Sequence, residues 1–364
     1  MENTYFDSFS DPDIAGPLAE KLKSITLRSP LTFMHVCGTH EHSIARAGIR
    51  SFLPEKLRLV AGPGCPVCVC PARDIDLAIE ASKRVGVIVA TFGDMFRVPS
   101  TRTSLEEMKA EGRDVRIVYS PIDAVRIARE NPGREVVFMA VGFETTAAPI
   151  AASLADDPPG NFSIITSLRL IPPAMKVLLD KGSIEGFILP GHVSTIIGRE
   201  SYLFMESGYC VPGVITGFET VDILRAIHEL IKEAIGGPPF NVVNLYKRAV
   251  SEEGNKKARE MISGLFEEVD SKWRGIGTIP GSGLKLLKKY EHLDAVTRLD
   301  LQPEDESVDV FPGCICHKVI LGESEPAECP LFGEKCTPRR PQGPCMVSSE
   351  GTCRARYQYR TVVR

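Results

Sequence analysis

Short hydrophobic runs alternate with amphipathic stretches from about residue 31 to about residue 240. The runs are mostly rich in Val and Ile and are largely apolar on both faces. Strands that are buried on both sides of a parallel sheet have this pattern. The sequence therefore predicts eight strands, at 31–36, 57–62, 85–92, 115–120, 135–141, 162–167, 185–190 and 211–216.

Three stretches between these runs carry apolar residues at helical spacing, at 72–84, 120–131 and 144–155. Proline lies at or just before the start of the first two, where its fixed φ suits a helix N-terminus. Alternation of strands and helices predicts βαβ units with right-handed crossovers. Because eight strands are many for one compact sheet, the pattern favours two α/β domains.

One short motif occurs twice in the chain, which supports an internal duplication. GFETTAAPI at 142–150 and GFETVDILRAI at 217–227 each follow an apolar run and open a helical pattern. Glu144 and Glu219 then fall at a helix start, where acidic residues stabilise the helix dipole. The alternative is that both GFET segments point into a shared cleft at the carboxyl ends of the strands, where open α/β sheets bind ligands.

The two ends of the chain differ from this middle part. The start is a polar lead-in with a short helix near 14–25, and the stretch 244–269 is charged and strongly helical in pattern. From about residue 300 the chain is rich in Pro, Cys and Gly. We expect a lead-in at 1–30, α/β domains at 31–135 and 136–240, and a helical segment with a small metal-binding domain at 241–364.

Four cysteines lie close together in the C-terminal tail, at Cys329, Cys336, Cys345 and Cys353. Pro, Gly and polar residues fill the gaps, so this tail cannot bury enough apolar surface to fold by itself. The spacing is wider than the paired knuckles of most zinc sites. It fits a [4Fe–4S] cluster better, whereas zinc, disulfides or free thiols are the alternatives.

Composition narrows the class of protein. The chain has 364 residues, is 43% hydrophobic and 25% charged, and carries a net charge of −4. This profile predicts a globular protein without bulk attraction to nucleic acid or membrane. We find no signal-peptide pattern at the start and no long apolar run. Eleven cysteines without such a signal favour metal ligation or redox chemistry in a reducing, cytoplasmic setting.

A first reactive motif, CGTHEH, follows the predicted strand at 31–36. It places Cys37 at the strand tip and His40, Glu41 and His42 directly after it. A thiol, two imidazoles and a carboxylate in this position could bind a metal or activate the thiol. The alternative is a buried cysteine with histidines that face the solvent.

A second motif, GPGCPVC, lies between the strand at 57–62 and the helix at 72–84. Cys65 and Cys68 form a C-x-x-C pair, and a thiol at a helix N-terminus has a lowered pKa, which favours metal binding or dithiol exchange. The preceding glycines allow a close backbone approach. Cys70 is either a third participant or a small buried residue, and we favour the latter.

Two further motifs are weaker. PGHVS places His192 and Ser194 at another strand tip, where a lone histidine is as often structural as functional. Cys314, Cys316 and His317 form a C-x-C-H motif that could supply metal ligands. The four C-terminal cysteines are already enough to ligate one metal centre, so we consider a functional role of this motif less favoured.

Taken together, these motifs resemble the HypD family of [NiFe]-hydrogenase maturation proteins. The resemblance covers nearly the whole chain and rests on CGTHEHSI (37–44), GPGCPVCV (62–69), FETT (143–146), PGHVS (190–194) and the cysteine-rich stretch 329–359. It implies two Rossmann-like α/β domains with a C-terminal [4Fe–4S] domain. It also implies a scaffold that works with the chaperone HypC and the cyanide donor HypE, on which Fe(CN)2(CO) forms before it passes to the hydrogenase large subunit.

The resemblance also implies roles for single residues. The essential cysteines of the family fall on Cys37, Cys65 and Cys68. Cys37 would bind the iron, His40 would be a second ligand or a proton carrier, and the C-x-x-C pair would deliver electrons or hold the iron. Cys70 departs from the family pattern. The cluster cysteines of the family fall on Cys329, Cys336, Cys345 and Cys353.

A second class of function also fits the motifs. A stand-alone iron–sulfur oxidoreductase could use the C-x-x-C pair on a small substrate.

Overall fold

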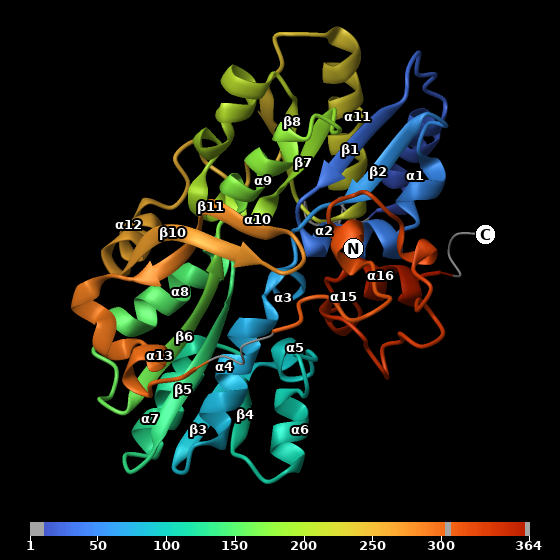
Figure 1. The fold of residues 1–364 in the computed structure, drawn as a ribbon. Coiled ribbons are helices and arrows are strands. Elements are labelled where there is room, and N and C mark those ends of the chain that lie inside the picture. The colour runs from blue at the N-terminus through green and yellow to red at the C-terminus, as the bar shows by residue number, and fades with distance from the viewer. Residues whose placement is uncertain (1–10, 303–306, 361–364) are drawn as a thin grey trace, which may run out of the picture.

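Two β-sheets with flanking helices organise the molecule, one in the upper right and one in the lower left of Figure 1. The structure is a computed structural model, and it describes residues 11–302 and 307–360. The α/β class is confirmed, because all eight predicted strands form and the sheets are mainly parallel.

The first sheet is wholly parallel, with the order β2-β1-β7-β8-β9. Its strands are β1 (Leu31–His35), β2 (Leu57–Ala61), β7 (Gly186–Pro190), β8 (Gly213–Thr216) and β9 (Val242–Asn244). The helices that follow or flank these strands are α1 (Pro12–Lys23), α2 (Gly38–Arg46), α9 (Ile171–Asp180), α10 (Gly191–Ile197) and α11 (Thr220–Gly236). Buried residues of α1, α2 and α11 share one core with this sheet. The expected N-terminal helix is thus confirmed as α1.

The second sheet has the order β10-β11-β6-β5-β3-β4, with β10 and β11 antiparallel to the strands beside them. Its strands are β3 (Val87–Phe92), β4 (Val115–Val118), β5 (Glu135–Gly142), β6 (Phe162–Arg169), β10 (Phe266–Trp273) and β11 (Gly277–Leu286). The predicted helices form as α4 (Ala72–Lys83), α7 (Pro121–Glu130) and α8 (Glu144–Ala155). β5 and β6 are buried along almost their whole length, which explains their continuous apolar sequence.

The two sheets take their strands from interleaved parts of the chain. β1 and β2 pair with β7–β9, whereas β3 and β4 pair with β5 and β6. The sheets therefore do not follow the contiguous halves 31–135 and 136–240 expected from the sequence. A hydrophobic pattern shows that a strand is buried, but not which strand lies beside it.

The expected helical segment after residue 240 is correct only in part. α12 (Lys256–Leu265) forms, but residues 266–286 make the hairpin of β10 and β11. Phe266 and Trp273 are buried at the two ends of β10, and most of the charged residues between them face outward at the sheet edge. The Glu-rich sequence favours a helix locally, and pairing with the neighbouring strand overrides this preference.

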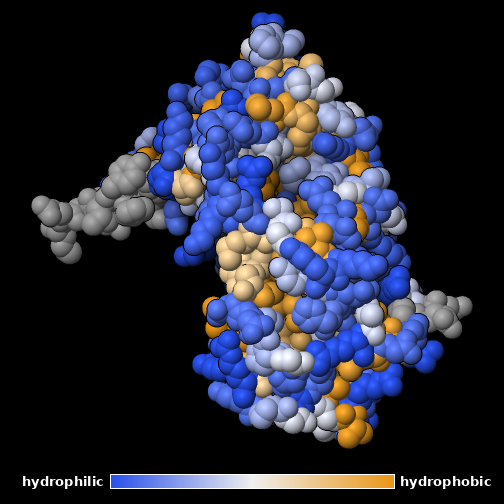
Figure 2. Space-filling model, turned by 90° about the vertical axis from the view of Figure 1, so that its left-hand side faces the viewer, coloured by the Kyte–Doolittle hydropathy of each residue, from blue (hydrophilic) through white to orange (hydrophobic). Residues whose placement is uncertain are grey.

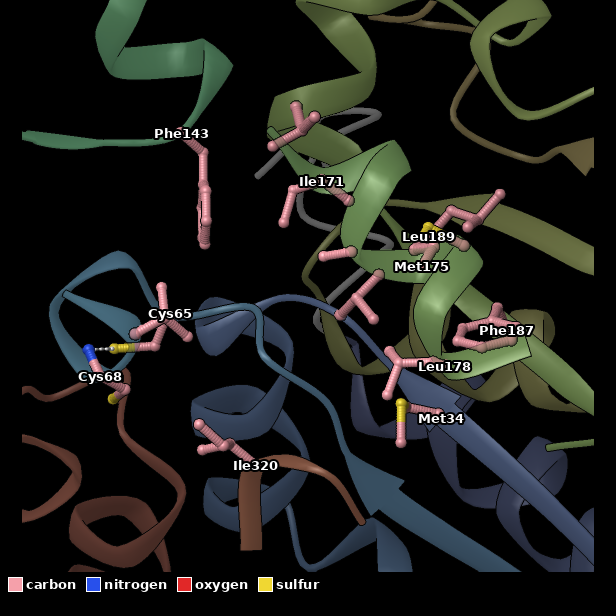
Figure 3. Close-up of a cluster of buried hydrophobic side chains, with 14 of the residues drawn as sticks. Met34, Cys65, Cys68, Phe143, Ile171, Met175, Leu178, Phe187, Leu189 and Ile320 are labelled. Carbon is pink, nitrogen blue, oxygen red and sulfur yellow. Dashed lines mark hydrogen bonds between the residues drawn. The ribbon is translucent and has the colours of Figure 1, made fainter. Parts of the chain in front are cut away.

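The cysteine-rich tail packs between the two sheets. It contains the short helices α14 (Cys316–Ile320), α15 (Pro344–Val347) and α16 (Thr352–Gln358). Of these, α16 lies beside α2 and α15 lies beside α3 (Pro66–Val69) (Figure 1). Buried residues of this tail join one hydrophobic cluster with residues of both sheets, part of which Figure 3 shows. The tail thus obtains from the rest of the chain the core that its own sequence lacks.

The remaining helical turns connect these elements. They are η2 (Ile49–Phe52), α5 (Gly93–Phe96), α6 (Leu105–Ala110), η3 (Glu200–Tyr202), η4 (Met205–Tyr209), η5 (Lys288–Leu293), α13 (Ala295–Arg298) and η6 (Pro326–Glu328). Among the residues that the structure describes, no helix combines the length and the apolar character needed to cross a membrane.

Candidate functional site

The CGTHE and GPGC motifs meet at the carboxyl ends of β1 and β2. Cys37 is the N-cap residue of α2, and the Gly38 N–H donates to the Gly64 carbonyl at 2.9 Å. A Cβ added to Gly64 would overlap the backbone nitrogen of Cys37. Because Gly64 has no side chain, the segment before Cys65 packs directly against the backbone of Cys37.

Glu41 is held by two basic side chains in the interior. Its carboxylate contacts His35 Nε2 at 2.7 Å and accepts from Arg50 Nη2 at 2.6 Å. Burial by itself raises the pKa of Glu41, but Arg50 and His35 outweigh it and hold the pKa at about 2. The carboxylate is therefore ionised, and it joins α2 to the end of β1 and to the segment after α2.

His40 is buried with one ring nitrogen free to act as a ligand. Its Nε2 lies 2.9 Å from the Gly217 carbonyl, which can only accept, so Nε2 carries the proton. Nδ1 is buried and finds no hydrogen-bond partner within residues 11–302 and 307–360. Burial lowers the pKa of His40 to about 3, and the ring is therefore neutral with a lone pair on Nδ1.

Phe218, of the second GFET motif, stacks against both His40 and His192 of the PGHVS motif. The Phe218 ring lies 4.7 Å from the His40 ring and 3.9 Å from the His192 ring, measured between centroids. Ser194 is buried near the same strand tip, and its Oγ lies 3.1 Å from the Tyr202 hydroxyl. The structure thus brings together strand tips that the sequence places far apart.

Glu144 of the GFETT motif is a buried acid at the start of α8. Its Oε1 accepts from the Ile171 N–H at 2.9 Å, while Oε2 lacks a partner in the described part of the chain. Burial raises the pKa of Glu144 to about 7. Burial raises the pKa of Tyr202, and the charge of Glu144 adds to this effect.

Glu144 also lines a cleft of about 670 Å³ between α9, α10, α12 and the hairpin. Figure 2 views the molecule from this side and shows hydrophobic side chains exposed at mid-height between hydrophilic ones. Lys176, Lys256 and Arg259 are among the lining residues.

The C-terminal tail packs against the residues that follow Cys37. The Thr39 hydroxyl donates to Glu350 Oε1 at 2.8 Å, and a Cβ added to Gly38 would overlap Glu350. Burial raises the pKa of the Cys37 thiol to about 12, and the nearby Glu350 carboxylate adds to this effect. Glu350 was not among the residues expected from the sequence, and nothing in its spacing points to Cys37.

The C-x-x-C pair lies buried at the start of α3. The Cys68 N–H donates to Cys65 Sγ at 3.3 Å, as the dashed line in Figure 3 shows. Burial and hydrogen bonds with Cys345 and Cys65 raise the pKa of Cys68, which is opposite to the direction expected for a helix N-terminus. Cys70 points elsewhere and lies 3.3 Å from Ser167 Oγ in a separate core, in accord with a buried structural residue.

Six cysteines line one small cavity next to this pair. The four expected members are Cys329, Cys336, Cys345 and Cys353, and Cys314 and Cys316 join them. Sequence spacing alone does not indicate that the C-x-C-H motif takes part, because the four C-terminal cysteines are enough to bind a cluster by themselves. Because this motif lies shortly before Cys329 in the chain, the sequence nevertheless contained a hint that six cysteines, and not four, belong to one group.

Hydrogen bonds link these thiols in two groups, and the charges of the two groups act on each other across the cavity. Cys314 interacts with Cys316 and Cys329, and the hydrogen bond with Cys316 lowers the pKa of Cys314 to about 7. Cys345 instead interacts with Cys353 and with Cys68 of the C-x-x-C pair, and these hydrogen bonds lower its pKa.

The donor set of the cavity suits an iron–sulfur cluster. Backbone N–H groups donate to the sulfur atoms of Cys314, Cys336 and Cys345 at 3.3–3.4 Å. Buried thiolates with N–H···S bonds are the surroundings that such clusters require. In the described residues no three His, Cys, Asp or Glu side chains close around a single-ion position.

Comparison with known proteins decides the family. The family described as "HypD: Hydrogenase formation hypA family" matches residues 13–360. This chain belongs to the HypD family. Hydrogenase maturation factor HypD2 of Bradyrhizobium diazoefficiens is 44% identical over 98% of this chain and 96% of its own length.

Two other relatives agree with this assignment to HypD. Hydrogenase maturation factor HypD of Escherichia coli is 40% identical over 98% of both chains. Its counterpart in Cupriavidus necator is 39% identical over 98% of this chain and 97% of its own. The resemblance read from the motifs is thus confirmed, and hydrogenase maturation is the role that the family supports.

Proposed function

We propose that this protein is the scaffold on which the Fe(CN)2(CO) unit of [NiFe] hydrogenases is assembled. A HypC-type chaperone and a HypE-type cyanide donor would be its partners in the cytoplasm, and the hydrogenase large subunit would receive the product. One observation carries the proposal: the segment of the C-x-x-C pair packs both against the Cys37 backbone, through Gly64, and against α15, the helix that carries Cys345 of the cysteine cavity.

The iron is the substrate, and Cys37 is its ligand on this protein. A thiolate is the soft donor that low-spin iron with cyanide and carbonyl ligands requires. His40 lies three residues after Cys37 at the start of α2, on the same side of the helix, and its Nδ1 lone pair makes it the second donor. Glu41 acts as a positioning residue, because its carboxylate is already engaged by His35 and Arg50.

The C-x-x-C pair supplies the redox step. Oxidation of the Cys65 and Cys68 dithiol forms one disulfide and releases two electrons and two protons. A [4Fe–4S] cluster in the cysteine cavity would exchange single electrons with this pair. Cys68 and Cys345 then form the contact between the two redox groups.

Two sets of residues compete as ligands of the cluster. Sequence spacing assigns Cys329, Cys336, Cys345 and Cys353. The contacts favour Cys314, Cys316, Cys329 and Cys336, with Cys345 and Cys353 placed between the cluster and the C-x-x-C pair.

Infrared spectroscopy tests the scaffold. The protein is produced with its partners, purified without oxygen and examined for cyanide and carbonyl bands. We expect these bands in the wild type and in the control Cys210→Ser, since Cys210 is an exposed thiol remote from the site. Cys37→Ser is expected to lose them, because an alkoxide replaces a thiolate poorly. Bands of full intensity from Cys37→Ser refute the assignment.

The second candidate is a stand-alone iron–sulfur dithiol oxidoreductase. The buried C-x-x-C pair beside the cysteine cavity is the observation that favours it. It predicts dithiol turnover on a small substrate and no cyanide or carbonyl bands in any preparation, so the same experiment separates the two functions.

A further inference from the structure

A buried arginine lies between the C-x-x-C loop and the cysteine cavity. Arg274 follows Trp273 at the end of β10, in the turn of the hairpin. Figure 1 places this end of the hairpin beside α3. A Cβ added to the next residue, Gly275, would overlap His317, the neighbour of Cys316, so the turn is pressed against the segment that carries this cysteine.

Hydrogen bonds join Arg274 to the end of the C-x-x-C loop and to the start of the cysteine-rich tail. Its backbone N–H donates to the Val69 carbonyl at 2.8 Å, and its Nε donates to the Cys70 carbonyl at 2.6 Å. Nη1 donates to the Asp309 carbonyl at 3.2 Å, just before the C-x-C motif. The guanidinium therefore joins the end of α3 to the start of the cysteine-rich tail.

Within the described residues, the guanidinium of Arg274 has no carboxylate as an ion-pair partner. Arg274 is 4% exposed, and its three partners are carbonyl groups. Across residues 11–302 and 307–360 its Nη2 also has no hydrogen-bond partner. Burial of an unpaired charge is strongly unfavourable, so buried cations are normally matched by a nearby negative group.

The cysteine cavity is where that negative charge would lie. The charge of Arg274 acts on the thiols of Cys316 and Cys70. A [4Fe–4S]²⁺ cluster with four thiolates carries a net charge of −2, and one added electron makes it −3 without forming or breaking a bond. A fixed cation at this place stabilises both states and the reduced state more strongly.

We propose that Arg274 is the charge-compensating residue of the iron–sulfur centre, and that it raises the reduction potential of the centre while it holds the C-x-x-C loop against it. The inference rests on the proposed iron–sulfur function. Arg274 acts through charge and position, and it is not a ligand.

Anaerobic redox titration of the cluster in the full-length protein tests the inference. The potential is followed by the visible absorbance and by electron paramagnetic resonance of the reduced cluster, and iron content is measured on the same samples. We expect the potential to become more negative in the order wild type, Arg274→Lys, Arg274→Gln. Lys keeps the charge, but its shorter reach cannot serve both carbonyls. Arg113→Gln, which removes an exposed arginine bound to the Lys83 carbonyl, is the matched control and should leave the potential unchanged.

Arg274→Met separates a charge role from a packing role. Arg274→Met removes the buried charge together with the hydrogen bonds to the Cys70 and Asp309 carbonyls, and the loss of these hydrogen bonds destabilises the protein with or without its cluster. If the charge also compensates the cluster, the substitution lowers stability to denaturant more in the loaded than in the cluster-free protein, whereas an equal loss in both forms would show a merely structural role. A more negative potential should accompany the larger loss in the loaded form.

The outcomes distinguish the inference from the function on which it rests. A wild-type protein without an iron–sulfur centre would end the proposed function. A full iron content with an unchanged potential in Arg274→Gln would overturn the role of Arg274 and leave that function intact. If neither neutral variant folds, Arg274→Lys decides: a potential equal to or more negative than that of the wild type agrees with a retained or displaced charge, and a more positive potential contradicts the inference.

Discussion

Gly64 lies so close to Cys37 that a side chain at this glycine would overlap the Cys37 backbone nitrogen. The Gly38 N–H also donates to the Gly64 carbonyl, so the two motif loops are joined by backbone groups alone. This junction places the residue before Cys65 against the backbone of Cys37, whose thiol we propose as the iron ligand.

Replacement of Gly64 by Ala should therefore be costly. We expect Gly64→Ala to lower the free energy of unfolding by about 3 kcal/mol, because the overlap is with backbone rather than with a flexible side chain. Chemical denaturation measures this. Gly133→Ala is the control, since a Cβ there meets nothing within 4 Å. Equal stability of the two variants would contradict the close packing.

Glu41 should stabilise the fold in a pH-dependent way. Arg50 and His35 hold its pKa at about 2 against an ordinary value of 4.5. A carboxyl group with a lowered pKa contributes its stability above about pH 4.5 and loses it as the pH falls toward 2. Glu41→Gln should cost about 3 kcal/mol at pH 7 and much less near pH 2. The exposed Glu111→Gln should show neither effect, and a constant cost across this range would show that Glu41 is not ionised in the fold.

Glu144 should make the stability of the fold depend on pH in the opposite direction to Glu41. Burial raises its pKa from 4.5 to about 7, so the folded protein favours the protonated acid. Stability is then lost as the pH rises from about 4.5 through 7, by about 3 kcal/mol in total. We expect Glu144→Gln to abolish this decline. Denaturation from pH 5 to 8 measures it, and a parallel decline in both proteins would contradict the raised pKa.

The reduced, cluster-free protein should show unequal thiol reactivity. Because the pKa of Cys68 is raised, little thiolate is present near neutral pH, and alkylation of Cys68 should be much slower than that of exposed Cys210. Mass spectrometry of timed alkylation measures both residues in one sample. Equal rates would contradict the buried, protonated state of Cys68.

The same method tests whether Cys65 and Cys68 cycle between dithiol and disulfide. As the redox potential is lowered from about −150 to about −350 mV, the pair should change from a disulfide, which is not alkylated, to a dithiol, which is alkylated. Unchanged alkylation across this range would mean that the pair binds iron without a redox role.

Iron analysis distinguishes the two ligand sets. Anaerobically purified wild type should contain about four irons and absorb broadly near 400 nm, as four-cysteine clusters do. On the contact-based set, Cys316→Ser loses the cluster and Cys345→Ser retains it. On the spacing-based set, the result is reversed. Zinc without iron in the wild type would end both assignments.

Much of this fold was readable from local patterns. Val- and Ile-rich runs identified all eight predicted strands, and the helices at 72–84, 120–131 and 144–155 lie within a residue of their predicted bounds. The hairpin at 266–286 was missed, because its glutamates prefer helices locally and only the neighbouring strand β6 makes it a sheet edge. Hydrophobic periodicity depends on near neighbours in the chain, whereas strand order depends on distant ones.

By itself, the sequence determined which residues have reactive chemistry, because thiol, imidazole and carboxyl groups at strand ends are visible in the chain. Only the tertiary structure decided which of them share a site and in which state. It brought Cys314 and Cys316 into the cysteine cavity, placed Glu350 against Gly38 and Thr39, and buried Arg274 with no ion-pair partner among the described residues. These relations depend on burial and on charges contributed by distant segments, and both arise only when the chain packs.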